Sequence, residues 1–232
     1  MRNLEETNGK HRGQSCFILG AGPSVHFLDR SLLKGHVVIA VNSGYCAYPQ
    51  ADYFVSDDHE TAKWNFFSND LKKSETTVLL YEDKLKDVAY LFGERAILFR
   101  HRKGYHITDH YLHDDPKLHI CQARTSLGSA IHIAHIMGFE KVGLLGVDCC
   151  RLEGHRYFWQ FWKDQPKRTD GHGPDKFVKI QHQGRQSDTD LVNIISYWHT
   201  RGEEMNKKIK IFNLSEISTI KIFPKITLKE FL

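Results

Sequence analysis

The sequence predicts an α/β protein with a doubly wound, mostly parallel sheet in a three-layer α/β/α arrangement. Short apolar segments rich in β-branched and aromatic residues alternate with stretches of helical character over the first 150 residues. These segments lack strict alternation of polar and apolar residues, as expected for strands that are covered on both faces. Strands that alternate with helices in this way are typical of a Rossmann-like parallel sheet.

The predicted strands are short and are separated by polar or turn-forming residues. They lie at residues 16–19, 37–41, 53–56, 77–81, 96–99, 142–147 and 210–213. Helical patterns occupy residues 24–33, 59–68 and 81–91, and the clearest helix covers residues 126–137. Ser126 is the expected N-cap of that helix and Gly138 its expected end. A capping-box pattern predicts a further helix from Ser187, and a short helix is expected at residues 227–232.

The length of 232 residues suits a single domain. Residues 1–14 are polar and are expected to form a flexible N-terminus, followed by one α/β domain at residues 15–232. The strand and helix patterns break down between residues 149 and 186, where glycine, proline and aromatic residues are frequent. A long irregular stretch of this kind in a compact domain is usually functional. We therefore expect residues 149–186 to form a lid over an active site.

Composition narrows the class of protein. The hydrophobic content of 41% and charged content of 26% are ordinary for a soluble globular chain. A net charge of +4 suits anionic small molecules but falls short of a nucleic-acid-binding signature. Five cysteines without a Cys-x-x-Cys pair predict reduced thiols and a cytoplasmic location. No membrane span is expected, because no long apolar run occurs, and homo-oligomerisation stays open.

The segment CFILGAGPSV at residues 16–25 is the first candidate binding site. A buried strand runs into a turn formed by Gly20, Gly22, Pro23 and Ser24, and a helical pattern follows. Glycines let backbone N–H groups approach a ligand, and a helix N-terminus favours a phosphate. Val25 stands where the third glycine of the dinucleotide fingerprint would lie. The alternative is a tight strand–helix turn without a ligand.

Polar residues also follow three other predicted strands. Asn42, the pair Asp57 and Asp58, and Asp148 each come directly after a strand. Ligands of doubly wound sheets collect at the carboxyl ends of the strands, so these residues are expected to converge there. Asn42 could equally form a turn, and the Asp pair could cap the following helix. The functional interpretation is that Asp57 or Asp58 binds Mg²⁺ or orients an acceptor.

A second candidate anion site lies at the start of the predicted helix at residues 126–137. Arg124, Thr125 and Ser126 place a guanidinium, two hydroxyls and backbone N–H groups together. Ordinary helix capping is the alternative. Of the 15 histidines, those at 106, 110 and 113 suggest an exposed polar face more than a metal site, and His132 and His135 suggest core or edge positions. Among the histidines of the expected lid, His182 is the favoured general base.

Three segments carry a resemblance to a known superfamily: ILGAGPS, VIAVN, and TSLGSAIHIAHIMGFEKVGLLGVD at residues 125–148. They resemble the superfamily that joins bacterial sialyltransferases of the Campylobacter type with MptE-like 6-hydroxymethylpterin diphosphokinases. The resemblance covers residues 16 to about 218. It implies that residues 20–24, Asn42 and the turn at Thr125 and Ser126 hold a cytidine nucleotide.

The same resemblance implies roles for other residues. Tyr157 matches a tyrosine that contacts the leaving phosphate, whereas Cys150 stands where the family has another. His182 matches the general base if a short insertion is allowed. Asp57 stands where the sialyltransferases have asparagine, and FVSDDH resembles the acidic strand end of the diphosphokinase branch, which uses metal-bound ATP.

Three functions follow as expectations. The leading one is a transferase that uses a nucleotide-activated donor, a sialyltransferase-like glycosyltransferase moving a sugar from a CMP- or other nucleotide-sugar to a carbohydrate-like acceptor hydroxyl. Tyr157 would stabilise the leaving nucleotide, and His182 or Asp57 would deprotonate the acceptor. The second is a Mg²⁺-dependent pyrophosphokinase of the 6-hydroxymethylpterin type, with Asp57 and Asp58 as metal ligands. The third is a non-catalytic nucleotide- or sugar-binding relative.

Overall fold

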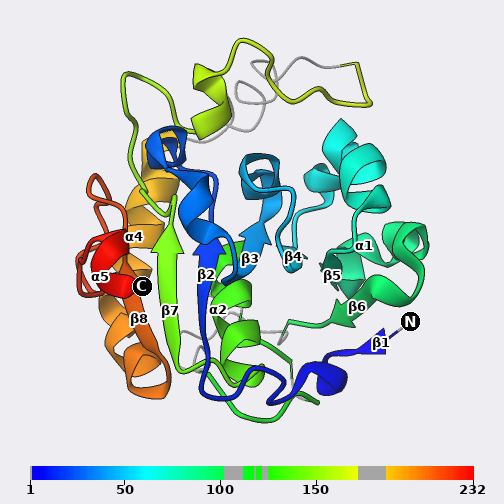
Figure 1. Ribbon diagram of the computed structural model, residues 1–232, viewed down its shortest axis with the longest axis horizontal. Helices are drawn as coiled ribbons and strands as arrows, with labels where there is room; N and C mark the ends of the chain where they lie inside the picture. Colours follow the sequence, from blue (N-terminus) through cyan, green and yellow to red (C-terminus); the bar gives the residue numbers. More distant parts are fainter. Residues whose placement is uncertain (1, 102–111, 118, 122–124, 172–186) are drawn as a thin grey trace.

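The computed structural model describes residues 2–101, 112–117, 119–121, 125–171 and 187–232 (Figure 1). Eight parallel strands form one sheet in the order β1-β6-β5-β4-β3-β2-β7-β8. The strands are β1 (Arg2–Asn3), β2 (Ser15–Leu19), β3 (Val37–Val41), β4 (Tyr53–Ser56), β5 (Thr77–Tyr81), β6 (Ala96–Phe99), β7 (Lys141–Leu145) and β8 (Lys210–Asn213). The doubly wound parallel sheet predicted from the sequence is confirmed.

The winding direction of the sheet reverses between β2 and β7. From β2 the chain moves outward through β3, β4, β5 and β6, and it then returns to β7 on the other side of β2. β2 and β7 are in register, with Leu19 opposite Leu145 at their carboxyl ends. Because the two strands lead into connections on different sides, a crevice opens beyond their ends, and ligands of this fold class bind in such a crevice.

Alternate side chains of each strand enter two separate cores, which makes the three layers. On one face, Ile18 packs with residues of α2 (Ser126–Ile136) and α4 (Ser187–Lys208). On the other face, Phe17 packs with α1 (Glu82–Ala89), α5 (Leu228–Phe231) and a series of short helical turns. These turns are η2 (Pro23–Phe27), η3 (Arg30–Leu33), η4 (Asn42–Ala47), η5 (His59–Lys63), η6 (Phe67–Leu71) and η7 (Tyr90–Arg95).

Two predicted helices are in fact pairs of short turns. The pattern at residues 24–33 divides into η2 and η3, and the pattern at 59–68 becomes η5 followed by the π-turn η6. In each pair an aspartate caps one turn: Asp29 caps η3 by accepting from the Ser31 N–H, and Asp58 caps η5 by accepting from the Glu60 N–H.

Thr125, and not the predicted Ser126, caps α2, because its Oγ1 accepts from the Gly128 N–H at 3.2 Å.

Residues 2–14, which the sequence predicts to be a flexible N-terminus, contact the domain at several points, and their flexibility stays a prediction. β1 pairs with β6, and the turn η1 (Leu4–Thr7) buries Leu4. The His11 ring stacks on Phe139 at a centroid distance of 4.5 Å. The sequence pattern misses this segment because its two-residue strand has no apolar run and depends on the free edge of β6.

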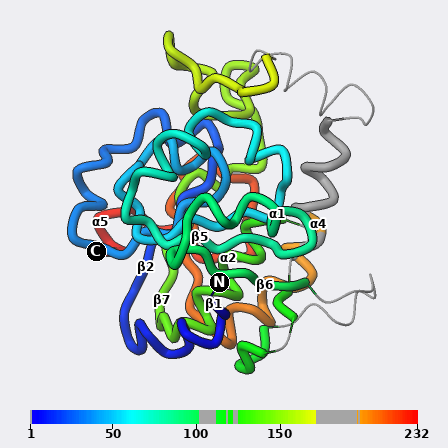
Figure 2. Tube along the Cα trace, turned by 90° about the vertical axis from the view of Figure 1, so that its right-hand side faces the viewer, coloured from blue at the N-terminus to red at the C-terminus, as the bar shows by residue number. Residues whose placement is uncertain are grey.

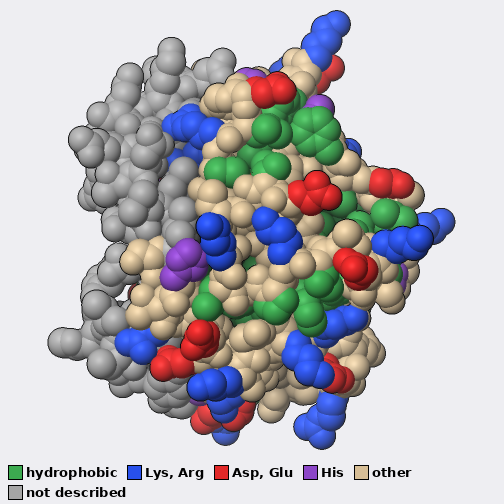
Figure 3. Space-filling view, turned by 90° about the vertical axis from the view of Figure 1, so that its left-hand side faces the viewer, with side chains coloured by type: hydrophobic (Ala, Val, Ile, Leu, Met, Phe, Trp, Pro, Cys, Tyr) green, Lys and Arg blue, Asp and Glu red, His purple; other side chains and the backbone are tan. Residues whose placement is uncertain are grey.

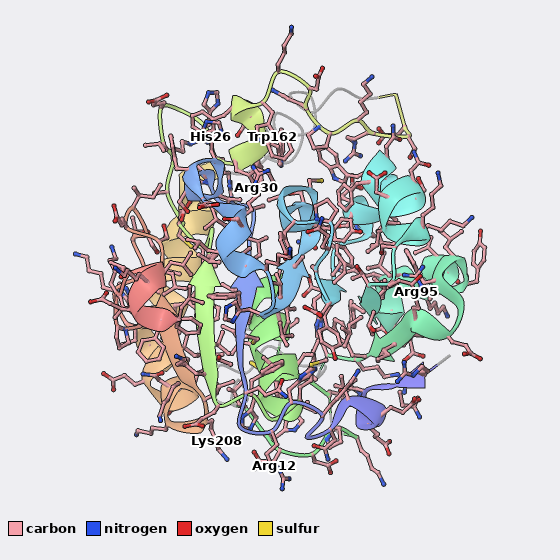
Figure 4. All side chains as sticks on the ribbon, viewed as in Figure 1. Arg12, His26, Arg30, Arg95, Trp162 and Lys208 are labelled. Atoms are coloured by element: carbon pink, nitrogen blue, oxygen red, sulfur yellow. The ribbon has the colours of Figure 1, made fainter. Side chains whose placement is uncertain are left out.

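The described part of the predicted lid, residues 149–171, crosses the carboxyl ends of the strands at the top of Figure 1, and Figure 2 shows the same overhang from the side. The turn η9 (Phe158–Phe161) buries Phe158 in the core. Figure 4 shows His26, Arg30 and Trp162 gathered where this segment meets η2 and η3, with the Arg30 guanidinium 5.4 Å from the Trp162 ring. The segment is therefore docked on the domain, and its action as a lid stays a prediction.

The surface carries charges of both signs, and the cysteines are not paired. On the face in Figure 3, basic and acidic side chains are interspersed with hydrophobic ones. All five cysteines are free thiols. Within the described ranges, no helix has the length and apolar character needed to cross a membrane.

The buried His132 of α2 is a satisfied core histidine, as predicted. Its Nδ1 accepts from the Cys121 N–H at 2.6 Å, and its Nε2 lies 3.0 Å from the His113 carbonyl oxygen. Because Nδ1 accepts this bond, it carries no proton, and the ring is neutral. Burial, reinforced by the neighbouring His113, lowers the pKa of His132 to about 3.

Acidification is expected to destabilise the protein through His132. The unfolded histidine has a pKa of 6.5 and the folded one about 3, so the stability present above pH 6.5 is lost as the pH falls towards 3. The loss from this residue approaches about 1.4 kcal/mol for each pH unit in that window. Urea unfolding from pH 7 to 4 should show a shallower pH dependence for His132→Gln. The exposed His36→Gln control should keep the wild-type slope, and equal slopes in all three proteins would contradict this assignment.

Candidate functional site

A cavity of about 300 Å³ lies at the carboxyl ends of β2, β3, β4 and β7, beneath residues 149–171. Its walls come from the glycine turn after β2, the ends of β3 and β7, the start of α2, and the segment around η9. Among the sequence-predicted residues, those that line it are Gly20, Gly22, Pro23, Asn42, Asp58, Thr125, Ser126, Asp148 and Tyr157. The expected convergence of polar strand ends is therefore found.

The glycine turn uses most of its backbone N–H groups within the protein. The Gly20 N–H donates to the Leu145 carbonyl at 2.8 Å, and the Gly22 N–H donates to the Gly146 carbonyl at 2.8 Å. The Ser24 N–H donates to Asp148 Oδ2 at 2.7 Å. These three amides are therefore already paired within the protein, and phosphate binding by the turn stays a prediction. The pairing of β2 with β7 simply continues into the turn.

Close packing explains why glycine occupies two positions of the turn. A Cβ on Gly20 would lie 2.6 Å from the Gly146 carbonyl oxygen, and one on Gly22 would lie 2.5 Å from Asp148 Oδ2. Asp148 is buried and also accepts from the hydroxyls of Ser24 and Ser215. Its carboxylate therefore fixes the turn from beneath, although the side chain also reaches the cavity wall. Ser24 itself does not line this cavity and faces Asp148.

The floor of the cavity is a hydrogen-bonded set of side chains from η4, η5, α2 and the residue that follows β4. The Ser126 hydroxyl donates to the buried Asp57 carboxylate and accepts from Asn42 Nδ2 at 3.2 Å. Thr61, which also lines the cavity, donates to Asn42 Oδ1 at 3.3 Å. Because the proton of Ser126 is directed at Asp57, this hydroxyl presents a lone pair to a ligand. It is suited to accept a hydrogen bond from a ligand hydroxyl and not to bind an anion.

Asp57 lies below this floor and is not exposed to the cavity. Its Oδ2 accepts from the Ser129 hydroxyl at 3.2 Å and lies 3.6 Å from His101 Nε2. Burial lowers the pKa of His101 to about 4 in spite of the nearby carboxylate, so this histidine is neutral at pH 7. The predicted use of Asp57 as a base in contact with the acceptor is not supported by this position, which suits a residue that orients Ser126.

Asp58 fits the capping alternative, and its functional role stays a prediction. It caps η5 by accepting from the Glu60 N–H at 3.0 Å, and it also lines the cavity. Burial raises the pKa of its carboxyl group. The predicted Mg²⁺ pair of Asp57 and Asp58 is divided, since only the second reaches the cavity. Across the described ranges, no group of three or more His, Cys, Asp or Glu side chains is placed to hold a metal ion.

The wall opposite the strand ends is aromatic and comes from residues 149–171 and from Trp64, which directly follows η5. The Tyr157 ring stacks on Trp159 at a centroid distance of 5.1 Å, and Trp159 contacts Trp64 at 5.5 Å. Trp159 Nε1 donates to the Ser43 hydroxyl at 3.3 Å, which joins this wall to η4, directly after β3. Burial raises the pKa of Tyr157, so its phenol stays protonated and can donate a hydrogen bond at neutral pH.

Two predicted site residues, Arg124 and His182, lie outside the described residues, as do His106, His110 and His172. His113, from the proposed polar histidine face, lies 2.7 Å through Nε2 from the His119 carbonyl oxygen. His135 pairs with Asp114 at 2.6 Å, which fits the predicted edge position.

Sequence reasoning missed part of the cavity wall. Trp64, Trp159 and Thr61 line the cavity without following a strand. Arg156, which also lines it, was indicated only by its position next to Tyr157. The aromatic density of residues 157–162 was the available signal, but the contact of Trp159 with Trp64, after η5, depends on tertiary docking.

Comparison with solved structures supports the same fold. The chain is similar to the Maf glycosyltransferase from Magnetospirillum magneticum AMB-1, with a TM-score of 0.58 at 11% identity. It is also similar to the Campylobacter jejuni sialyltransferase CstII solved with the substrate analogue CMP-3FNeuAc, with a TM-score of 0.50 at 15% identity, covering 92% of this chain and 86% of that one. The match to the Maf enzyme covers 99% of this chain but 38% of the longer enzyme. Neither a protein-family model nor a curated protein sequence matches the chain. At these identities the similarity establishes the α/β fold.

Proposed function

We propose that this protein is a glycosyltransferase that transfers a sugar from a nucleotide-sugar donor to an acceptor hydroxyl. The observation that carries the proposal is the cavity at the reversal point of the sheet, walled by polar strand ends on one side and by Tyr157 on the other. Its volume of about 300 Å³ lies at the lower end of the range for small-molecule sites. Two solved structures of the same fold are glycosyltransferases, and one of them holds a CMP-sugar analogue.

The residues divide into roles consistent with this reaction. Ser126 and Asn42 would accept and donate hydrogen bonds to hydroxyls of the donor. Tyr157 would donate to the leaving phosphate as negative charge develops there. His182 remains the base proposed from the resemblance. Asp58 is a second candidate, because burial raises its pKa and it lines the cavity.

A nucleotide panel tests this proposal. CMP, CDP, UDP, GDP and ATP would be added with and without Mg²⁺ while the melting temperature is followed. A bound nucleotide at 100 times its dissociation constant should stabilise the protein by about 2.7 kcal/mol. We expect stabilisation by at least one pyrimidine or guanine nucleotide, and release of that nucleotide from the matching nucleotide-sugar. If no nucleotide raises the melting temperature, the proposal fails, and stabilisation by Mg²⁺-ATP alone would favour the pyrophosphokinase.

A further inference from the structure

We propose that Arg156 is the phosphate-binding residue of the cavity, so that the segment at residues 149–171, and not the glycine turn, binds the anionic part of the ligand. This inference rests on the proposed nucleotide-sugar function and deepens it. It gives a specific role to a residue that the sequence indicated only as a neighbour of Tyr157.

The strand-end side of the cavity is poorly suited to a phosphate. The amides of Gly20, Gly22 and Ser24 already donate within the protein. The carboxylates of Asp58 and Asp148 line this same side. Like charges at a few ångströms repel, and the repulsion grows where water is excluded. A phosphate is therefore expected to bind on the other wall.

Arg156 is held on that other wall by its own backbone. The N–H groups of Arg156 and Tyr157 both donate to Gln160 Oε1, at 2.8 and 2.9 Å. The next residue, Phe158, donates its N–H to the Ala21 carbonyl at 3.2 Å, which ties the segment to the glycine turn. The position of Arg156 is thus fixed relative to the strand ends before any ligand binds.

The chemistry of this wall suits a phosphate. Among the described residues that line the cavity, Arg156 is the one cationic side chain. Its guanidinium lies over the Tyr157 ring, 5.9 Å from the ring centroid, so the cation and the tyrosine belong to the same wall. Arginine binds phosphate oxygens through two parallel N–H donors, and these charge-assisted bonds are stronger than neutral ones. The ligand class is therefore a nucleoside mono- or diphosphate whose sugar or base faces the strand ends.

The test compares each nucleotide with its nucleoside in wild type, Arg156→Ala, Arg156→Lys and Arg151→Ala. Arg151 is a matched control because it lies five residues away, is exposed, and donates to the Gly154 carbonyl without lining the cavity. Dissociation constants of CMP and cytidine, or UDP and uridine, would be measured by calorimetry. We expect Arg156→Ala to weaken nucleotide binding by about 10- to 100-fold and nucleoside binding by less than about twofold. Arg156→Lys should be intermediate, and Arg151→Ala should match wild type.

Two results would overturn the inference: an equal loss for nucleotide and nucleoside, or unchanged nucleotide affinity in Arg156→Ala. Inorganic pyrophosphate separates this inference from the proposed function. Pyrophosphate binding that is lost in Arg156→Ala, with no nucleotide bound by wild type, would retain the anion site and reject the glycosyltransferase. Nucleotide binding that persists in Arg156→Ala would retain the enzyme and reject Arg156. Circular dichroism of each variant verifies that it is folded.

Discussion

Asp148→Asn is expected to lower the free energy of unfolding by about 2–4 kcal/mol and to weaken ligand binding by more than tenfold. The buried carboxylate accepts the Ser24 N–H and the Ser24 hydroxyl, each at 2.7 Å, and also the Ser215 hydroxyl. An asparagine has one accepting oxygen, and its NH₂ group would face donors. At least one buried donor is left without an acceptor, and the turn that forms one cavity wall is released.

Asp29→Asn is the matched control for this substitution. Asp29 also accepts from a serine N–H and hydroxyl, those of Ser31, at 3.0 and 2.7 Å, but on the exposed surface. Water replaces lost bonds there, so its loss of stability should be much smaller. Urea unfolding and nucleotide calorimetry measure both effects. Similar destabilisation by the two variants would show that burial of Asp148 beneath the turn does not increase its contribution to the free energy of unfolding.

The strands could be predicted because their signal is local. Each is a short apolar run, and the predicted bounds at residues 37–41, 53–56, 77–81, 96–99 and 210–213 coincide with β3, β4, β5, β6 and β8. β7 ends at Leu145, two residues before the prediction, because Gly146 adopts a left-handed φ of 64°. Val147, the last residue of the predicted strand, is apolar and buried but lies beyond the end of β7.

The candidate site was predictable only in part, for a physical reason. Strand order brings Asn42, Asp58 and Asp148 to one edge of the sheet, so their convergence follows from the fold class. The hydrogen bonds that each of these groups makes do not follow from the fold class. The Asp148 side chain satisfies Ser24, and the Asp57 side chain satisfies Ser126, so two expected ligand contacts are internal. Such pairings join residues about 70 to 120 positions apart and leave no local pattern.

Arg168→Ala should be the second severely destabilising change and should lower the free energy of unfolding by about 2–4 kcal/mol. This loss is somewhat smaller than for a fully buried ion pair, because the partners of Arg168 are partly exposed. The Arg168 side chain is 2% exposed; its Nη2 lies 2.9 Å from Glu60 Oε2, and its Nε donates to Asp170 Oδ1 at 3.1 Å. Its guanidinium also covers the Trp64 ring at 5.3 Å. Removing it takes one cation from Asp170 and leaves Glu60 with Lys63, and it loosens an aromatic residue of the cavity wall.

The same contact connects residues 149–171 with η5. The Asn65 N–H donates to the Lys167 carbonyl at 2.8 Å, and the Thr169 N–H donates to the Lys63 carbonyl at 2.7 Å. Arg168→Ala should therefore change tryptophan fluorescence and weaken nucleotide binding, besides lowering the urea midpoint. Arg100→Ala is the control, because Arg100 makes a similar two-bond contact with Glu82 but its side chain is 61% exposed. An exposed pair of this kind contributes little to stability.

The pH dependence gives an independent measure of the Arg168 contact. Burial raises the pKa of Glu60, but hydrogen bonds from Lys63 and Arg168 outweigh it, and the net pKa is lowered from 4.5. A lowered pKa means that this stabilisation is present above pH 4.5 and is lost as the pH falls below it. The difference in unfolding free energy between wild type and Arg168→Ala should accordingly shrink on acidification. A difference that stays constant from pH 7 to pH 3 would mean that Arg168 acts through packing on Trp64 and not through its charge.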